Sequence, residues 1–154
     1  MQFRWPGAWF FVWRKGSKKM VVRVVRLGSV RGEGEGLRIG TVRRPPRGVP
    51  RAEFGTHNWY DVWFPNLAPS VETMKLGQAA TTPVEWAAFA RKYRAEMATP
   101  ENSHSLELLA ALSRQTNFSV GCYCENEAHC HRLVLRALLG ERGARVEPAA
   151  PEGQ

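Results

Sequence analysis

Cysteine is scarce in this sequence, and its few copies are crowded into one place. The 154 residues include three cysteines, Cys122, Cys124 and Cys130. An odd number within one short segment is a poor disulfide framework. It fits a reducing compartment, where such clusters more often bind metal or react. We therefore expect a cytoplasmic protein.

Long hydrophobic runs are also missing, so no transmembrane helix is expected. Hydrophobic residues make up 44% and charged residues 23% of the chain, as in ordinary globular proteins. A chain of this length can bury a core without disulfide or metal staples, and we expect a single domain.

Acidic residues are sparse in the first third of the chain. Residues 1–19 hold five basic residues and no acid, and residues 20–51 hold eight arginines against Glu33 and Glu35. Because the whole chain carries +8, residues 52–154 are left with about −3. Such a basic stretch is either a solvated face or a surface that binds anions.

Three segments are expected along the chain. Residues 1–19 have a short apolar run followed by basic residues, the wrong flank for a secretory signal, and we expect a leader outside the fold. Residues 20–146 should form the domain. Residues 147–154, rich in Pro, Ala, Gly and Glu, are expected to be a disordered tail.

Strand signals dominate the start of this domain. Valine-rich residues 20–27 predict a strand, and residues 37–42 can return as a second one. The glycine-rich residues 28–36 between them are interpreted as a flexible hairpin loop. Prolines and glycine break regular structure in residues 43–50, and residues 51–70 predict short helical turns.

Helix signals dominate the rest. Ser70 is a candidate N-cap for a brief helix ending at Gly77, and Thr82, Pro83 and Glu85 predict the start of a longer one. Residues 103–114 predict another helix, residues 118–124 a short strand, and residues 129–139 a last helix. This alternation predicts a compact, single-domain, layered α/β fold with a small, mostly parallel sheet flanked by helices.

The candidate site is the strand-to-helix turn from Cys122 to Arg132. Cys122 and Cys124 share one strand face because strand side chains alternate. His131 and Arg132 fall in the first turn of the following helix, where unpaired N–H groups and the helix dipole favour anions. A turn of this kind at the carboxyl edge of a sheet is a common ligand site in α/β proteins.

Four interpretations of this turn are open. It is an anion or phosphate site, a reactive thiolate at Cys124 or Cys130, a zinc site, or packed cysteines beside a solvated helix start. The zinc signal is weak, because zinc needs about four ligands in a tetrahedron. All the candidate ligands lie between Cys122 and His131, with no distant partner. We therefore expect no metal ion and no cofactor.

Arg43, Arg44 and Arg47 form a second basic group, which neighbouring prolines hold stiffly. This group could meet the helix start across the edge of the sheet. We expect Cys124, Glu125 and His131 to be catalytic: Glu125 or His131 would move protons, since histidine titrates near neutral pH. The expected ligand-binding residues are Arg43, Arg44, Arg47, Cys130 and Arg132.

These residues resemble a known family, the domain of unknown function 488 proteins, and especially its YeaO-like branch. The resemblance covers about residues 20–143 and implies a compact α/β fold with a parallel-type sheet. Since the family has no established activity, it implies the location of a site more than a reaction. The matches, in chain order, are Arg43 to Val49, Trp63, Leu67-Ala68-Pro69-Ser70, Trp86, Phe89, Tyr93, Glu96, Cys124-Glu125 and Cys130-His131-Arg132.

The chain departs from the YeaO-like pattern in two places. Val42 stands where those members carry an aspartate, which argues against a carboxylate-dependent mechanism. Several members lack the cysteines but keep the histidine that matches His131, which argues against a thiol or zinc chemistry common to the family.

The expected function is that of an enzyme or ligand-binding protein acting on a phosphate-bearing or other anionic small molecule, such as a nucleotide. One rival is a nucleic-acid-binding module that uses the arginine-rich residues 20–51. Another is a zinc-stabilised structural domain.

Overall fold

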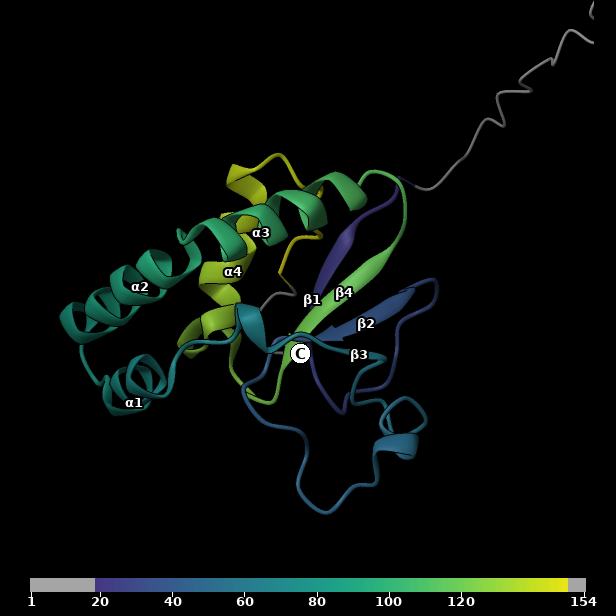
Figure 1. Ribbon diagram of the computed structural model, residues 1–154, viewed down its shortest axis with the longest axis horizontal. Coiled ribbons are helices and arrows are strands. Elements are labelled where there is room, and N and C mark those ends of the chain that lie inside the picture. The colour runs from purple at the N-terminus through teal and green to yellow at the C-terminus, as the bar shows by residue number, and fades with distance from the viewer. Residues whose placement is uncertain (1–18, 150–154) are drawn as a thin grey trace, which may run out of the picture.

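The computed structural model describes residues 19–149. Four strands form one parallel sheet in the order β1–β4–β2–β3, and Figure 1 shows the helices gathered on one side of it. This arrangement confirms the predicted layered α/β fold. The strands are β1 (Val22–Arg26), β2 (Leu37–Gly40), β3 (Val62–Trp63) and β4 (Phe118–Cys122). The helices are α1 (Val71–Ala79), α2 (Pro83–Met97), α3 (Pro100–Leu112) and α4 (His131–Glu141).

The glycine-rich loop after β1 is not a hairpin, and the sequence-based interpretation was wrong. β1 and β2 run parallel, and β4 lies between them, pairing Phe118 with both Val22 and Leu37. The loop therefore carries the chain back along the sheet to the start of β2. Gly36, at φ 77°, passes so close to Asn117 that a Cβ would lie 2.1 Å from its carbonyl oxygen.

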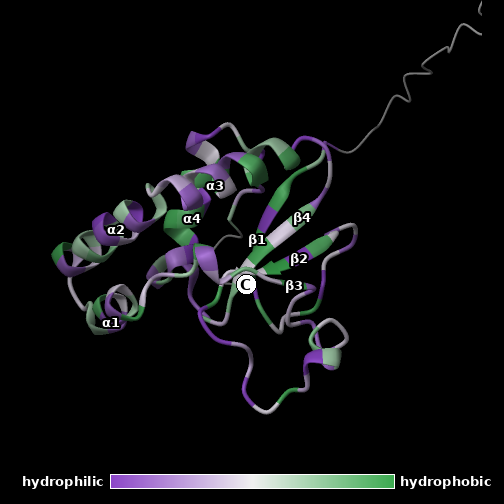
Figure 2. Ribbon diagram, in the orientation of Figure 1, coloured by the Kyte–Doolittle hydropathy of each residue, from purple (hydrophilic) through white to green (hydrophobic). Residues whose placement is uncertain are grey.

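One face of the sheet is apolar and packs against helices. The core joins Val22 of β1, Ile39 of β2 and Val120 of β4 to side chains of α2, α3 and α4. Hydrophobic and hydrophilic residues alternate along β1 and around α2 (Figure 2), as half-buried elements require.

The other face of the sheet holds a buried ion pair. Arg38, which is fully buried, donates to both carboxylate oxygens of Glu35 at 2.7 and 3.0 Å. It also donates to the carbonyls of Ser29 and Asn58, while Glu35 accepts from the hydroxyl of Ser119. Burial alone would raise the pKa of Glu35, but these hydrogen bonds outweigh it and hold the pKa below its ordinary value.

The helix ends follow local signals closely. Ser70 caps α1 through the N–H of Thr73, and Thr82 with Glu85 forms the predicted capping box of α2. α3 begins three residues earlier than predicted, at Pro100. The last helix begins at His131 because a separate 3₁₀ turn, Glu127–His129, precedes it. The strand β3 was not predicted.

The described residues stop short of both ends of the chain. The expected leader lies outside the described residues except for Lys19, and residues 150–154 of the expected tail also lie outside them. The chain is still paired at Glu147, whose N–H donates to the carbonyl of Val22. No helix among residues 19–149 has the length and apolar character needed to cross a membrane.

The substitution Glu35→Gln should lower the free energy of unfolding by about 3 kcal/mol at pH 7, because it leaves the charge of Arg38 buried and unpaired. Urea denaturation measures this loss. The matched control is Arg94→Gln, which removes an exposed ion pair with Glu141 and should cost about 1 kcal/mol or less. Equal losses of unfolding free energy in the two variants would contradict the stabilising role of the pair between Glu35 and Arg38.

The cost of Glu35→Gln should also depend on pH. A carboxyl group whose pKa is lower in the folded than in the unfolded chain stabilises the fold above its unfolded pKa. That contribution is lost as the pH falls through the folded value. The difference between wild type and variant should therefore shrink once the pH drops below about 4.5, the ordinary pKa of glutamate. If the difference in unfolding free energy between wild type and variant stayed constant at lower pH, the pairing of Glu35 with Arg38 would be contradicted.

Candidate functional site at the carboxyl edge of the sheet

A pocket of about 870 Å³ lies where β1, β2 and β4 end. Its walls come from the residues that follow each strand, from the start of α4, and from the facing sides of α1 and α2. Because the strands are parallel, their carboxyl ends meet at one edge, the usual ligand position in open α/β sheets. The segment after β2 supplies Val42 to Arg47, and the segment after β1 supplies Leu27 to Ser29.

The pocket lining is positively charged and otherwise largely apolar. Among residues 19–149 it contains no aspartate or glutamate. Aromatic rings of Trp59, Trp86 and Phe89 form part of the apolar surface. The cationic side chains in the lining are Arg26, Arg43, Arg44, Arg47 and Lys75.

The predicted arginine group lies on this pocket, but its members have different tasks. Arg43 donates to the carbonyls of Ala68 and Pro69, and so ties the segment after β2 to the start of α1. Arg44 and Arg47 are exposed on the pocket rim. The carbonyl of Arg44 accepts a hydrogen bond from the hydroxyl of Tyr123 at 2.9 Å, which holds this rim against the end of β4.

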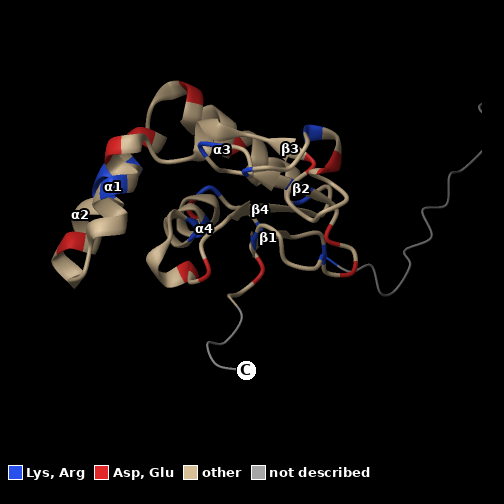
Figure 3. Cartoon of the chain, turned by 90° about the horizontal axis from the view of Figure 1, so that it is seen from below, with Lys and Arg blue, Asp and Glu red and all other residues tan. Residues whose placement is uncertain are grey.

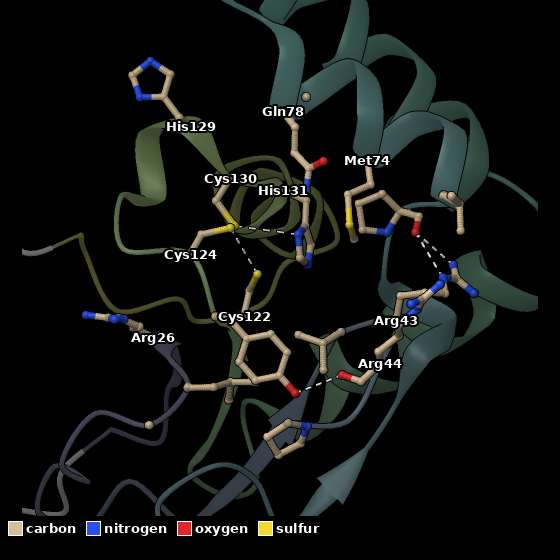
Figure 4. A pocket seen from close by; sticks show the side chains of 18 of the residues that line it. Arg26, Arg43, Arg44, Met74, Gln78, Cys122, Cys124, His129, Cys130 and His131 are labelled. Carbon is tan, nitrogen blue, oxygen red and sulfur yellow. Dashed lines mark hydrogen bonds between the residues drawn. The ribbon is translucent and has the colours of Figure 1, made fainter. Parts of the chain in front are cut away.

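The three cysteines meet in one cluster in the pocket wall. Their sulfur atoms all lie within 4.8 Å of one another, and those of Cys122 and Cys124 are 3.6 Å apart. Figure 4 shows these side chains and His131 directed toward one another, whereas His129 points away. Cys122 and Cys130 are 6% and 3% exposed, while Cys124 is exposed.

His131 is buried and held in a defined orientation. Its Nε2 lies 2.9 Å from the carbonyl oxygen of Thr41. A carbonyl can only accept, so Nε2 carries the proton and donates it. In the neutral ring, Nδ1 then has a free lone pair, and this atom lies 3.7 Å from the sulfur of Cys130. The ring of Tyr93 packs edge-on against the imidazole at 5.6 Å.

The three thiols differ in acidity. Hydrogen bonds from Cys122 and Cys130, aided by the charge of Arg132, lower the pKa of Cys124. The hydrogen bonds that Cys122 makes with its two neighbours raise its own pKa, and burial adds to this. The hydrogen bond with Cys122 lowers the pKa of Cys130. Negative charge in the cluster therefore favours Cys124 and Cys130 over Cys122.

Two predicted site residues lie apart from the pocket lining. Glu125 is exposed and faces Arg26 at 3.4 Å. Arg132 is buried, and its guanidinium donates to the carbonyl of Cys124 at 2.6 Å, which holds the loop before α4. Its Nε has no hydrogen-bond partner among the described residues.

The start of α4 is not capped by a carboxylate. Its N-cap is Cys130, which makes no side-chain capping bond. Glu127 instead accepts from Arg136, so neither nearby glutamate blocks the helix N–H groups. The side chains of His131 and Arg132 point to carbonyls of the protein, so the helix start presents backbone donors rather than these two groups.

Sequence reasoning missed several residues of the pocket. Lys75 and Met74 of α1 carry no motif, and neither does Trp59, which is half-buried and lines the pocket. Thr41 could have been found, because it directly follows β2 and the carboxyl ends of parallel strands are where ligand sites form.

The sequence matches the family model DUF488-N3a, described as the active DUF488-N3 subclade, over residues 22–143. The chain belongs to the DUF488 family. The match confirms the family that the sequence resembles, but not the YeaO-like branch. Neither a curated protein nor a solved structure matches the chain.

Cys124 should be the first cysteine of the native, reduced protein to react with iodoacetamide, because the other two are buried. Fragment-ion mass spectrometry of the peptide that holds all three cysteines locates the label. In the Cys124→Ser variant, rapid labelling should disappear. Equal rates at the three positions in the folded wild type would contradict the arrangement of the cluster.

Proposed function

We propose that this protein binds a phosphate-bearing or other anionic small molecule in the pocket at the carboxyl edge of the sheet. One observation carries the proposal: five cationic side chains and no acidic one line a pocket of about 870 Å³. A cavity of this size suits a small organic ligand. Glu125 faces only Arg26, and the positive charge of the other four side chains favours a ligand with negative charge.

The apolar part of the lining narrows the ligand class. A free inorganic anion would leave the rings of Trp59 and Trp86 unused. A ligand that joins a flat ring to a phosphate, as a nucleotide does, would place the ring on these side chains and the phosphate near Arg44 and Arg47. Arginine presents forked donors that match phosphate geometry.

Cys124 is the candidate reacting group of this pocket. It is the exposed member of the cysteine cluster, and thiolates are strong nucleophiles. The description of the matching subclade as active agrees with an enzyme rather than a passive binding protein. Glu125, which points to solvent and Arg26, is less well placed to move protons than His131.

The rival function, nucleic-acid binding by the basic residues 20–51, has less support. Five of the eight arginines there have internal partners, Arg26 through Glu125, so the formal charge overstates what is free to meet a phosphate backbone. The other internally engaged arginines are Arg23, Arg31, Arg38 and Arg43. Figure 3 shows basic and acidic segments interspersed rather than one basic face.

Isothermal titration with adenosine monophosphate and with inorganic phosphate tests the proposal. We expect both to bind, and the nucleotide to bind more tightly. The double variant Arg44→Gln/Arg47→Gln should weaken binding by about tenfold or more, because a hydrogen bond to a charged group contributes roughly 1.5–3 kcal/mol and 1.4 kcal/mol is a factor of ten.

The control is Arg91→Gln, an exposed arginine of α2 that does not line the pocket. It should leave the dissociation constants unchanged. No heat with either ligand at millimolar concentration, or equal losses in control and double variant, would overturn the proposal. Binding of random oligonucleotides with a steep salt dependence would favour the rival instead.

A further inference from the structure

We propose that Cys122, Cys124 and Cys130, completed by Nδ1 of His131, form a binding site for zinc. Zinc in proteins is commonly held by four such ligands in a tetrahedron. This inference does not rest on the proposed anion site, because it concerns only the cluster in one wall of the pocket.

The sulfur positions are close to those that a metal ion requires. A tetrahedral ion with zinc–sulfur bonds of about 2.3 Å has sulfur atoms about 3.8 Å apart. Cys122 and Cys124 are 3.6 Å apart, and all three sulfurs lie within 4.8 Å of one another. The sulfurs that lie farthest apart must therefore approach by up to about 1 Å to hold an ion.

His131 provides a second, independent observation. A metal-bound histidine nearly always donates its other ring N–H to a carboxylate or carbonyl, which fixes the ring and leaves one nitrogen free to bind. Here Nε2 donates to the carbonyl of Thr41, and Nδ1 faces the sulfur of Cys130 at 3.7 Å. The ring thus holds Nδ1 beside the sulfur of Cys130, while the atoms that all lie within 4.8 Å of one another are the three sulfurs alone, so His131 must approach the other two sulfurs when an ion binds.

The charge around the cluster also fits. Three thiolates and one divalent cation leave one excess negative charge. Arg132, whose guanidinium binds the carbonyl of Cys124, offsets that charge from within the protein.

The sequence led us to expect no zinc because all the candidate ligands lie between Cys122 and His131, with no distant partner. The ligands lie within a few residues of one another, but the 3₁₀ turn Glu127–His129 reverses the chain between Cys124 and Cys130. This turn brings the start of α4 back to the end of β4. Ligands that are close in the sequence can therefore surround one ion without a distant cysteine.

Zinc binding would have a consequence for the pocket. An ion held by all four ligands takes the sulfur of Cys124, so this thiol could no longer act as a nucleophile. Metal occupancy would therefore control the reactivity of the pocket, while its basic rim stayed free to bind anions.

The test uses the full chain, reduced and stripped of metal with a chelator. Titration with zinc against a chromophoric chelator should show one ion per chain. Cobalt should give the strong bands of a tetrahedral site and a thiolate-to-cobalt charge-transfer band. Zinc should also protect Cys124 from iodoacetamide and raise the melting temperature of the wild type.

Two variants make the result specific. Cys124→Ser changes an exposed residue, so it should fold, and it should weaken zinc binding by about tenfold or more. His129→Gln removes a neighbouring histidine that points away from the cluster and should bind zinc like the wild type.

Absence of the charge-transfer band with excess cobalt would overturn the proposal, as would equal zinc affinities in wild type and Cys124→Ser. Binding of phosphate or nucleotide is measured separately, on the metal-free protein and on its Arg44→Gln/Arg47→Gln variant. The zinc site and the proposed anion site can therefore fail independently.

Discussion

The buried ion pair between Glu35 and Arg38 decides how the first third of the chain is arranged. A guanidinium taken fully out of water must find partners for its donors. Arg38 finds them in Glu35 and Ser29 of the loop after β1, and in Asn58 of the segment before β3. Both segments are thereby fastened over the same face of the sheet, and Ser119 joins β4 to the network.

The position of the pocket follows from this arrangement. With the return loop laid across one face, β1, β4 and β2 all run the same way and end at the same edge. Segments far apart in the sequence then meet there. The bond between His131 and the carbonyl of Thr41 joins the end of β2 to the start of α4, and Arg43 joins the same loop to α1. The walls of the pocket are thus braced by hydrogen bonds between protein groups.

Features that depend on neighbours in the sequence could be predicted. The capping box at Thr82 is local and present, and the strand predicted for residues 118–124 is present as Phe118–Cys122. The insertion of β4 between β1 and β2 could not be predicted, because it depends on pairing across about a hundred residues. β3 has two residues and no pattern of its own.

Part of the predicted segment from Cys122 to Arg132 lines the pocket, but the sequence does not give the directions of its side chains. Sequence places His131 and Arg132 at a helix start, yet it does not tell which way their side chains turn. Both turn toward carbonyl groups, His131 to Thr41 and Arg132 to Cys124. The convergence of the cysteines likewise depends on the 3₁₀ turn that Asn126 caps, and the sequence does not tell where this turn places their sulfur atoms.

The pairing of Glu147 with Val22 matters for how the protein behaves at high concentration. Unpaired strand edges are templates for association with other chains. The bridge between Val22 and Val146 occupies part of the outer edge of β1. The opposite edge, β3, is only two residues long, is followed by Pro65, and has its Trp63 side chain bonded to the carbonyl of Val42. Within residues 19–149, neither side of the sheet thus offers a long, flat template for strand-by-strand aggregation.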